Sequence, residues 1–264
     1  MDPVGRFQRR PSRRSTPHAP APACTSFQAN QTMTGTLYGI GVGPGDPELL
    51  TFKAARLIRQ CPVVAYIANQ QGASQARVIA QEHLIDQLEL PIYMPFERQR
   101  DAALSVYDQA AADIAHRLEH GQDVAVLCEG DPLLFGSFIY LHDRLGERFP
   151  CQIVPGISSI MAAAAAARHP LTRLEQSLRI LPATAGPERL ASALHEPGPL
   201  VIMKPGRQYG EILRLLRRTG RDADSVYVEY ASRDTQRIIR CHEAMPDGEQ
   251  GPYFALFLIG AQPC

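Results

Sequence analysis

The sequence predicts an α/β protein with two lobes. Short apolar runs that are typical of buried strands alternate with amphipathic helical segments along most of the chain. In the first half these runs end in turns rich in glycine and proline that lead into helices, and a second series of strands and helices starts after His169-Pro170. The chain has 264 residues, of which 45% are hydrophobic, enough to bury the core of one large or two medium domains.

The first lobe is expected to span residues 33–168. Its predicted elements, in order, are a strand that begins at Leu37, a helix at Glu48–Arg59, a strand at Val63–Ile67, a helix at Ser74–His83, a connection at Pro91–Phe96, a helix at Asp101–His120, strands at Val124–Cys128 and Cys151–Val154, and a helix at Ser159–Ala167. The long helix carries apolar residues at helical spacing from Leu104 to Leu118, and Gly121 ends it. The alanine-rich run at the end of the lobe strongly favours a helix.

The second lobe is expected to span residues 169–264. Its β-branched and aromatic runs predict strands, and helical patterns separate them. The predicted strands are Leu178–Leu181, Leu200–Met203 and Ser225–Tyr230, the helices are Pro187–His195 and Tyr209–Arg218, and Arg237–Cys241 with Tyr253–Ile259 is expected to form a closing antiparallel pair.

Residues 1–32 differ from the rest of the chain. Five arginines lie among prolines, serines and threonines with almost no apolar periodicity. Such a segment cannot bury enough surface to offset its ordering entropy, so we expect a disordered tail. Met33 is the expected natural start, and the preceding stretch is interpreted as an extension or a dispensable tail; a basic nucleic-acid arm or a transit peptide is the alternative.

The charge balance and the spacing of the cysteines limit the classes of function that we expect for this chain. The whole chain has 27 basic and 27 acidic residues, but residues 33–264 keep 22 basic and 26 acidic ones. A domain that binds nucleic acid is normally basic, so we expect no nucleic-acid partner. No apolar run is long enough to span a bilayer and the six cysteines form no Cys-x-x-Cys pair, so we expect no membrane partner and a cytoplasmic location.

Three loops that contain glycine carry the strongest functional signal. The first, Gly39-Ile40-Gly41-Val42-Gly43-Pro44-Gly45-Asp46-Pro47, suits close backbone contact with a ligand because glycine has no Cβ, yet it fits neither the dinucleotide nor the phosphate-loop pattern. The others are Glu129-Gly130-Asp131-Pro132-Leu133-Leu134-Phe135-Gly136-Ser137 and Pro155-Gly156-Ile157-Ser158-Ser159, and each follows a buried-type strand. The carboxyl ends of parallel strands share one sheet edge, so the three loops are expected to line one cleft.

In this order, the three loops closely resemble those of the tetrapyrrole (class III) S-adenosylmethionine-dependent methyltransferases. The similarity runs from about Gly35 to Gly260. Within the family, residues 35–51, 180–184 and 228–232 look most like the branch that methylates carbon 20 of precorrin-2. The resemblance implies two α/β lobes with S-adenosyl-L-methionine in the cleft between them, a tetrapyrrole substrate in an adjoining trough, and a homodimer.

The resemblance also implies individual cofactor contacts. The positions that match the family's cofactor site are Pro44, Gly130, Asp131, Leu134, Ser158, Ser159, Met203 and Ala231. Their chemistry suits this role, because Asp131 can accept hydrogen bonds from a ribose or an amino group and Met203 offers apolar packing to adenine. Two residues depart from the family's pattern: Glu129 stands where a small residue is common, and Ala231 where glycine often occurs.

Methyl transfer from a sulfonium needs neither a catalytic triad nor a metal, because the methyl group is already a strong electrophile and positioning should dominate. No catalytic residue is assigned: a general base that removes the meso proton would be Glu129, Tyr230 or a histidine. The acetates and propionates of the substrate favour arginine partners, with Arg98, Arg100 and Arg168 as candidates.

Several alternatives stay open at this point. The substrate is expected to be precorrin-2, which would give precorrin-3A, or its cobalt-loaded counterpart, cobalt-factor II. The same fold and cofactor would also serve another corrin position, uroporphyrinogen III, an rRNA ribose or a diphthine-type substrate. A non-catalytic cofactor-binding or assembly protein is a third class.

A rival motif is His116-Arg117-Leu118-Glu119-His120, which matches a zinc-protease pattern. Leu118 belongs to the apolar stripe of the long helix, and a cationic histidine near the helix end simply complements the helix dipole. Short matches of this kind often arise by chance, so no metal site is expected.

Overall fold

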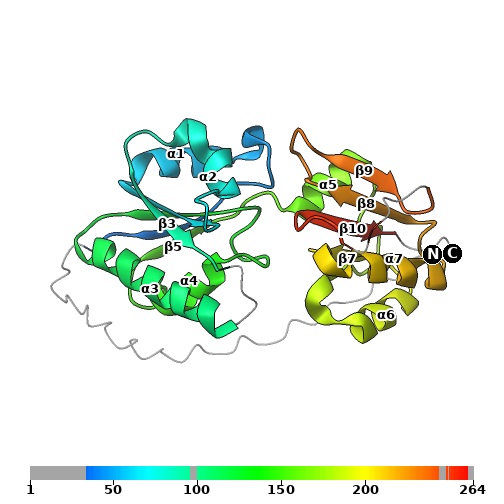
Figure 1. The fold of residues 1–264 in the computed structure, drawn as a ribbon. Coiled ribbons are helices and arrows are strands. Elements are labelled where there is room, and N and C mark those ends of the chain that lie inside the picture. Colours follow the sequence, from blue (N-terminus) through cyan, green and yellow to red (C-terminus); the bar gives the residue numbers. More distant parts are fainter. Residues whose placement is uncertain (1–33, 96–99, 244–247, 249, 261–264) are drawn as a thin grey trace, which may run out of the picture. The chain divides into compact units, whose positions relative to one another are not determined.

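The computed structural model describes residues 34–95, 100–243, 248 and 250–260, which form two sheets with helices on both faces of each (Figure 1). The tail predicted for residues 1–32 lies outside the described residues. No helix in the described part is both long and apolar enough to cross a membrane. The two α/β lobes expected from the sequence are confirmed, and the boundary at residue 168 stays a prediction.

The first sheet consists of parallel strands in the order β3-β2-β4-β1-β5. The strands are β1 (Leu37–Gly41), β2 (Val63–Ala68), β3 (Leu88–Tyr93), β4 (Val124–Cys128) and β5 (Cys151–Val154). All five residues of β4 are buried, as expected of a central strand that helices cover on both faces. Because β4, β1 and β5 are neighbours, the loops that follow them leave the same sheet edge side by side, as the sequence predicts.

Four helices cover this sheet. In Figure 1, α1 (Phe52–Gln60) and α2 (Gln75–Ala80) lie on one face, and α3 (Arg100–Glu119) and α4 (Phe138–Leu145) lie on the other. Alternate residues of each strand point to opposite faces, so one sheet contributes to two separate cores. Ile40 of β1 packs with the first helix pair, and Leu37 of the same strand packs with the second pair.

The second sheet has the order β6-β7-β10-β8-β9. Its strands are β6 (Arg179–Pro182), β7 (Leu200–Met203), β8 (Ser225–Glu229), β9 (Arg237–Arg240) and β10 (Ala255–Ile259). Only β6 and β7 run parallel; the other neighbours are antiparallel. The helices α6 (Pro187–His195) and α7 (Tyr209–Thr219) pack on one face, and α5 (Ser159–Ala167) packs on the other. By its contacts, α5 belongs to the second sheet, although it precedes the predicted boundary.

Three local expectations are wrong. Instead of one helix at Glu48–Arg59, a 3-10 turn at Pro47–Leu49 precedes α1, because the Thr51 side chain caps α1 by accepting a hydrogen bond from Ala54 N at 3.1 Å. Part of the predicted connection at Pro91–Phe96 belongs to β3, an edge strand, where a proline is tolerated. Strands β9 and β10 do not pair with each other, because β8 lies between them and pairs with both.

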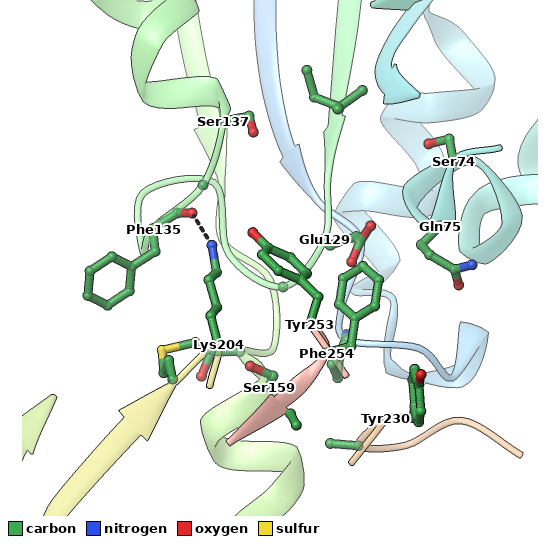
Figure 2. A pocket seen from close by; sticks show the side chains of 18 of the residues that line it. Ser74, Gln75, Glu129, Phe135, Ser137, Ser159, Lys204, Tyr230, Tyr253 and Phe254 are labelled. Atoms are coloured by element: carbon green, nitrogen blue, oxygen red, sulfur yellow. Dashed lines mark hydrogen bonds between the residues drawn. The ribbon is translucent and has the colours of Figure 1, made fainter. Parts of the chain in front are cut away.

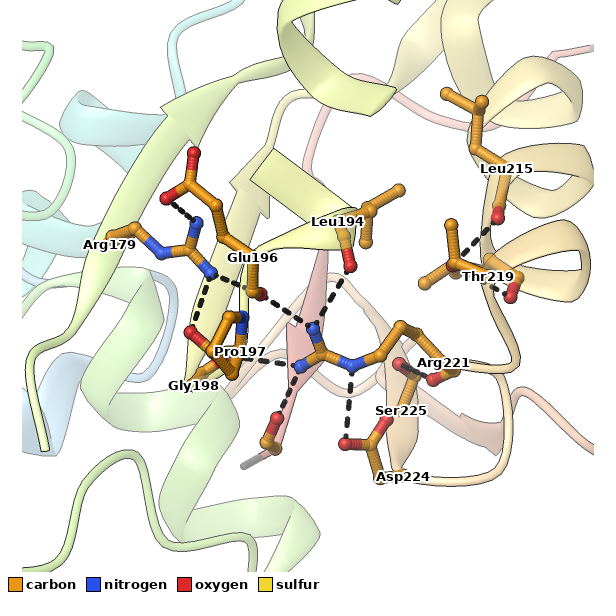
Figure 3. A network of polar contacts seen from close by, with 12 residues as sticks. Arg179, Leu194, Glu196, Pro197, Gly198, Leu215, Thr219, Arg221, Asp224 and Ser225 are labelled. Carbon is orange, nitrogen blue, oxygen red and sulfur yellow. Dashed lines mark hydrogen bonds and ion pairs between the residues drawn. The ribbon is translucent and has the colours of Figure 1, made fainter. Parts of the chain in front are cut away.

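A buried arginine connects several segments of the second lobe through hydrogen bonds (Figure 3). Arg221, which follows α7, is 1% exposed, and its Nε lies 3.5 Å from the carboxylate of Asp224. Its guanidinium also donates hydrogen bonds to the backbone carbonyls of Leu194, Glu196, Gly198 and Gly260. These contacts satisfy carbonyls at the end of α6 and just after β10 that the regular elements leave unpaired.

Candidate functional site

A cavity of about 550 Å³ lies where the loops after β1, β4 and β5 meet the second sheet. All eight positions predicted for the cofactor line it: Pro44, Gly130, Asp131, Leu134, Ser158, Ser159, Met203 and Ala231. They come from both lobes and lie up to 187 positions apart in the chain. The structure therefore brings the predicted residues together, while their role as cofactor contacts stays a prediction.

The three loops pack against one another through their backbones. Gly43 N and Gly130 N each donate to the carbonyl of the other residue, at 3.4 and 2.8 Å. A Cβ at Gly41 would lie 2.5 Å from Gly156 N and 2.6 Å from Gly130 O, and a Cβ at Gly156 would collide with Gly130 O. Glycine is required at these positions because no side chain fits between the loops.

Asp131 holds the second and third loops together. Its Oδ1 accepts a hydrogen bond from Leu133 N at 2.9 Å, and its Oδ2 accepts one from Gly156 N at 3.1 Å. The sequence predicts that Asp131 accepts hydrogen bonds from a ligand. The structure adds a second role, since Asp131 also connects the two loops. A carboxylate oxygen accepts more than one hydrogen bond, so both roles are compatible.

Backbone strain is concentrated around the cavity. Three of its lining residues that are not glycine have a left-handed backbone: Phe135 (φ 53°), Lys204 (φ 57°) and Tyr230 (φ 49°). This conformation is uncommon for side chains of this size and costs on the order of 1–3 kcal/mol per residue. Such strain gathers at sites where a ligand requires a particular backbone direction.

Arg233, on the loop after β8, joins this loop to the first lobe, and the sequence analysis missed it. Its Nε donates to Pro44 O at 3.3 Å, and its Nη2 donates to Glu129 Oε2 at 3.4 Å. The guanidinium carbon lies 4.2 Å from the centroid of the Phe254 ring, a cation–π arrangement. Next to it, the Ser232 hydroxyl accepts a hydrogen bond from Asp46 N at 3.1 Å. No sequence spacing signals the contacts with the first lobe, because they join residues between 104 and 189 positions apart in the chain.

The electrostatics of the cavity centre on Glu129. Burial raises the pKa of its carboxyl to about 7, against the opposing influence of Arg233 and Lys204. Burial also lowers the pKa of the Arg233 guanidinium, and the nearby Glu129 opposes that shift. The Lys204 ammonium donates to Phe135 O at 3.2 Å and lies 5.3 Å from the centroid of the Tyr253 ring (Figure 2).

Some predicted residues lie elsewhere. Arg168 ends α5 and lines a shallow hollow with Met161 and His169, so it does not contact the cavity as expected of a substrate-binding arginine. Arg98 lies outside the described residues, and so does the side chain of Arg100, the first residue of α3. The described histidines do not line the cavity either, so they drop out as candidates for the general base there.

The rival zinc motif has a structural explanation. The exposed rings of His116 and His120 lie 4.4 Å apart at the C-terminal end of α3, and Glu119 forms an ion pair with Arg148 at 3.4 Å. Among the described residues, no group of three or more histidine, cysteine, aspartate or glutamate side chains could hold a metal ion.

Comparison with known proteins identifies relatives of the chain. Residues 36–245 match the family of tetrapyrrole (corrin/porphyrin) methylases. The chain is 40% identical to the cobalamin biosynthesis protein CobIJ of Mycobacterium tuberculosis, over 85% of this chain and 46% of that protein, and so spans about half of its length. It is 37% identical to the precorrin-2 C(20)-methyltransferase of Sinorhizobium, over 85% of this chain and 95% of that enzyme. It is 31% identical to the cobalt-precorrin-2 C(20)-methyltransferase of Salmonella typhimurium, over 87% and 98%.

Solved structures share the fold. A cobalt precorrin-4 methyltransferase superposes with a TM-score of 0.67 at 24% identity, over 85% of this chain and 94% of the other. A uroporphyrin-III C-methyltransferase from Thermus thermophilus, solved with S-adenosylhomocysteine, superposes with a TM-score of 0.59 at 24% identity, over 86% and 97%. At this level of identity the likeness establishes the two-lobed fold.

Proposed function

Because the chain belongs to the family of tetrapyrrole (corrin/porphyrin) methylases, we propose that it transfers a methyl group from S-adenosyl-L-methionine to carbon 20 of precorrin-2. The product would be precorrin-3A, in the biosynthesis of the corrin ring of cobalamin. The observation that carries the proposal is the match across 95% of the length of the Sinorhizobium precorrin-2 C(20)-methyltransferase. The match to CobIJ supports this reaction less directly, because it covers only 46% of that longer protein.

The lining of the cavity fits S-adenosyl-L-methionine. Leu134 and Met203 offer apolar surface for an adenine ring, and Gly130, with φ of 67° and no side chain, leaves its backbone open to a ligand. Ser159 adds a hydroxyl at the start of α5. A volume of about 550 Å³ is within the range of small-molecule sites. The bound donor would supply an electrophilic methyl group, and the eight predicted residues would hold it.

The other lining residues would position the substrate and exclude water. Ile67, Leu127 and Phe254 give the cavity apolar walls, which strengthen electrostatic interactions inside it. The ammonium of Lys204 is available to a substrate carboxylate, since its partner, Phe135 O, is an uncharged carbonyl. With a reactive methyl group and an electron-rich ring carbon, correct placement supplies most of the catalysis.

The proposal includes the state of the protein. We place the enzyme in the cytoplasm as a homodimer, with lobes at residues 33–168 and 169–264 and with no nucleic-acid or membrane partner. Exposed apolar side chains on the second loop, the third loop and α5, namely Leu133 (52% exposed), Ile157 (38%) and Met161 (56%), offer surface to a second subunit. Sedimentation velocity would test this part, and a monomer at micromolar concentration would contradict it.

The cobalt-loaded substrate is a second candidate. It is favoured by the match across 98% of the Salmonella typhimurium cobalt-precorrin-2 C(20)-methyltransferase, at a lower identity of 31%. Both candidates share the ring carbon that receives the methyl group, and the cobalt-loaded one already has the metal bound to the ring.

The experiment that tests the proposal measures transfer of a radiolabelled methyl group under anaerobic conditions. The purified full-length chain would be incubated with precorrin-2, cobalt-factor II and uroporphyrinogen III in separate reactions, each with labelled S-adenosyl-L-methionine. We expect transfer to precorrin-2, with cobalt-factor II as the competing substrate. Transfer to uroporphyrinogen III alone would contradict the proposed substrate, and only the assignment to the family would remain valid.

A further inference from the structure

We propose that Glu129 accepts the proton that the substrate carbon loses after it has received the methyl group. This inference rests on the proposed function, because it assigns a proton acceptor to that reaction. Nothing in the family match or in the names of the relatives assigns such a role.

The reaction requires a proton acceptor. The ring carbon forms a bond to the methyl carbon while the methyl–sulfur bond breaks, and the sulfur keeps that electron pair. The ring carbon then carries both the methyl group and its original hydrogen, and the ring carries a positive charge. Transfer of that hydrogen as a proton to a carboxylate returns the C–H electron pair to the ring and restores conjugation. The acceptor ends as a neutral carboxylic acid, so atoms and charge balance.

Glu129 has the geometry of such an acceptor. It follows β4 directly, lines the cavity, and is 32% exposed at its side chain. In Figure 2 its carboxylate lies in the central part of the view, and Tyr253 and Phe254 line the same cavity. Arg233 contacts Oε2, and among the described residues Oε1 has no hydrogen-bond partner. One oxygen is therefore anchored, and the other is free to take a proton from a ligand.

The other candidates in the cavity fit this role less well. Both carboxylate oxygens of Asp131 already accept backbone hydrogen bonds that hold two loops in place. Tyr230 lines the cavity, but a neutral phenol must lose its own proton before it can accept another. Since the described histidines lie outside the cavity, Glu129 is the carboxylate or imidazole best placed to act.

The charges around Glu129 suit a base that works at neutral pH. Burial raises the pKa of its carboxyl to about 7, so the ionised and protonated forms are both accessible near neutrality. Arg233, on the loop after β8, and Lys204, after β7, favour the ionised form. Among the described residues, the titratable and charged groups that line the cavity with Glu129 are Asp131, Lys204, Tyr230, Arg233 and Tyr253.

The first test measures kcat against pH for the full chain with precorrin-2. For the wild type we expect an acidic limb with a midpoint near pH 7. Glu129→Gln should lower kcat by about 10²- to 10⁴-fold and remove that limb, and Glu129→Asp should recover part of the rate. Affinity for S-adenosylhomocysteine, measured by calorimetry, should stay within about threefold. The matched control is Glu119→Gln, a surface glutamate that also pairs with an arginine and should leave rate and pH profile unchanged.

The second test measures the titration of the Glu129 carboxyl directly and does not depend on catalytic turnover. The protein labelled with ¹³C at the glutamate side-chain carboxyls would be titrated by NMR, for the wild type and for Glu129→Gln. We expect one resonance that titrates near pH 7 and is missing from the variant. A Glu129 resonance that titrates near its ordinary value, or a variant with unchanged kcat and pH profile, would overturn the inference. If the wild type methylates neither precorrin-2 nor cobalt-factor II, the proposed function falls, and this inference falls with it.

Discussion

The Nη2 atom of Arg233 lies 3.4 Å from Oε2 of Glu129, and this contact joins the loop after β8 to the loop after β4. Arg233 also donates to Pro44 O, so one side chain links the second lobe to two of the three loops of the first. Its side chain is only 14% exposed, which limits the screening of its charge by water. Arg233 therefore links the loops that line the cavity, and its charge favours the ionised form of Glu129 against the effect of burial.

Replacing Arg233 should shift the pH dependence of the enzyme. Arg233 favours the ionised form of Glu129, so Arg233→Gln should raise the pKa of Glu129 above its value of about 7. The carboxylate then ionises only at higher pH, and the acidic limb of the kcat profile should move upward by about one pH unit. Arg237→Gln, which removes a comparable arginine–glutamate contact of 3.3 Å outside the cavity, is the control. A downward shift, or equal shifts in both variants, would contradict this interpretation.

Asp131→Ala should weaken cofactor binding. The substitution leaves Leu133 N and Gly156 N without their acceptor and frees the second loop from the third. Loss of such contacts costs about 1–3 kcal/mol, so we expect affinity for S-adenosylhomocysteine to fall about 5- to 160-fold in a calorimetric titration. His116→Ala, on the exposed face of α3, should have no effect. Equal and negligible effects of the two substitutions would show that the cofactor binds elsewhere.

Gly156→Ala should disrupt the cavity through the backbone. The added methyl group would collide with Gly130 O, so the second and third loops must separate. We expect S-adenosylhomocysteine binding to fall below detection and the free energy of unfolding to drop by about 1–3 kcal/mol. Gly198→Ala is a useful comparison: its φ of 99° is strained for alanine, but nothing lies within 4 Å of the new methyl group. That variant should lose stability and keep ligand affinity, and binding retained in Gly156→Ala would refute the packing argument.

Arg221→Met should destabilise the second lobe without a direct effect on the cavity. It removes the partner of Asp224 and leaves several buried carbonyls without a donor (Figure 3). Breaking a buried ion pair in this way costs about 3–5 kcal/mol, measured as the free energy of unfolding in urea. Arg148→Met removes an exposed pair with Glu119 and should cost less than about 1 kcal/mol. Similar losses in both variants would contradict the assigned role of Arg221.

Much of the fold follows from local sequence signals. The buried strands β1, β4 and β5 and the long helix α3 have clear apolar patterns, and the turns after these strands are marked by glycine and proline. Two of the three expectations that failed depend on contacts distant in sequence. The strand β3 contains Pro91 and is recognisable only from its pairing with β2, and the separation of β9 from β10 depends on β8 entering between them.

In the candidate site, too, residues on recognisable motifs could be predicted from the sequence, and residues without a motif could not. The eight positions implied by the resemblance lie on loops with recognisable motifs, and all of them line the cavity. Arg233 has no such motif, since its partners Pro44 and Glu129 come from the other lobe. Arg168 is a predicted site residue that lies outside the cavity. The sequence shows a cationic residue near a motif, but it does not show in which direction the end of α5 points.

The measurement that tests the central claim most directly is the position of the transferred methyl group. The protein would be incubated anaerobically with precorrin-2 and S-adenosyl-L-methionine carrying a ¹³C methyl group, and the product would be analysed by mass spectrometry and ¹³C NMR. We predict a mass increase for a single methyl group and one enriched methyl resonance coupled to carbon 20. A methyl group on any other ring carbon, or none on precorrin-2 and cobalt-factor II alike, would contradict the claim.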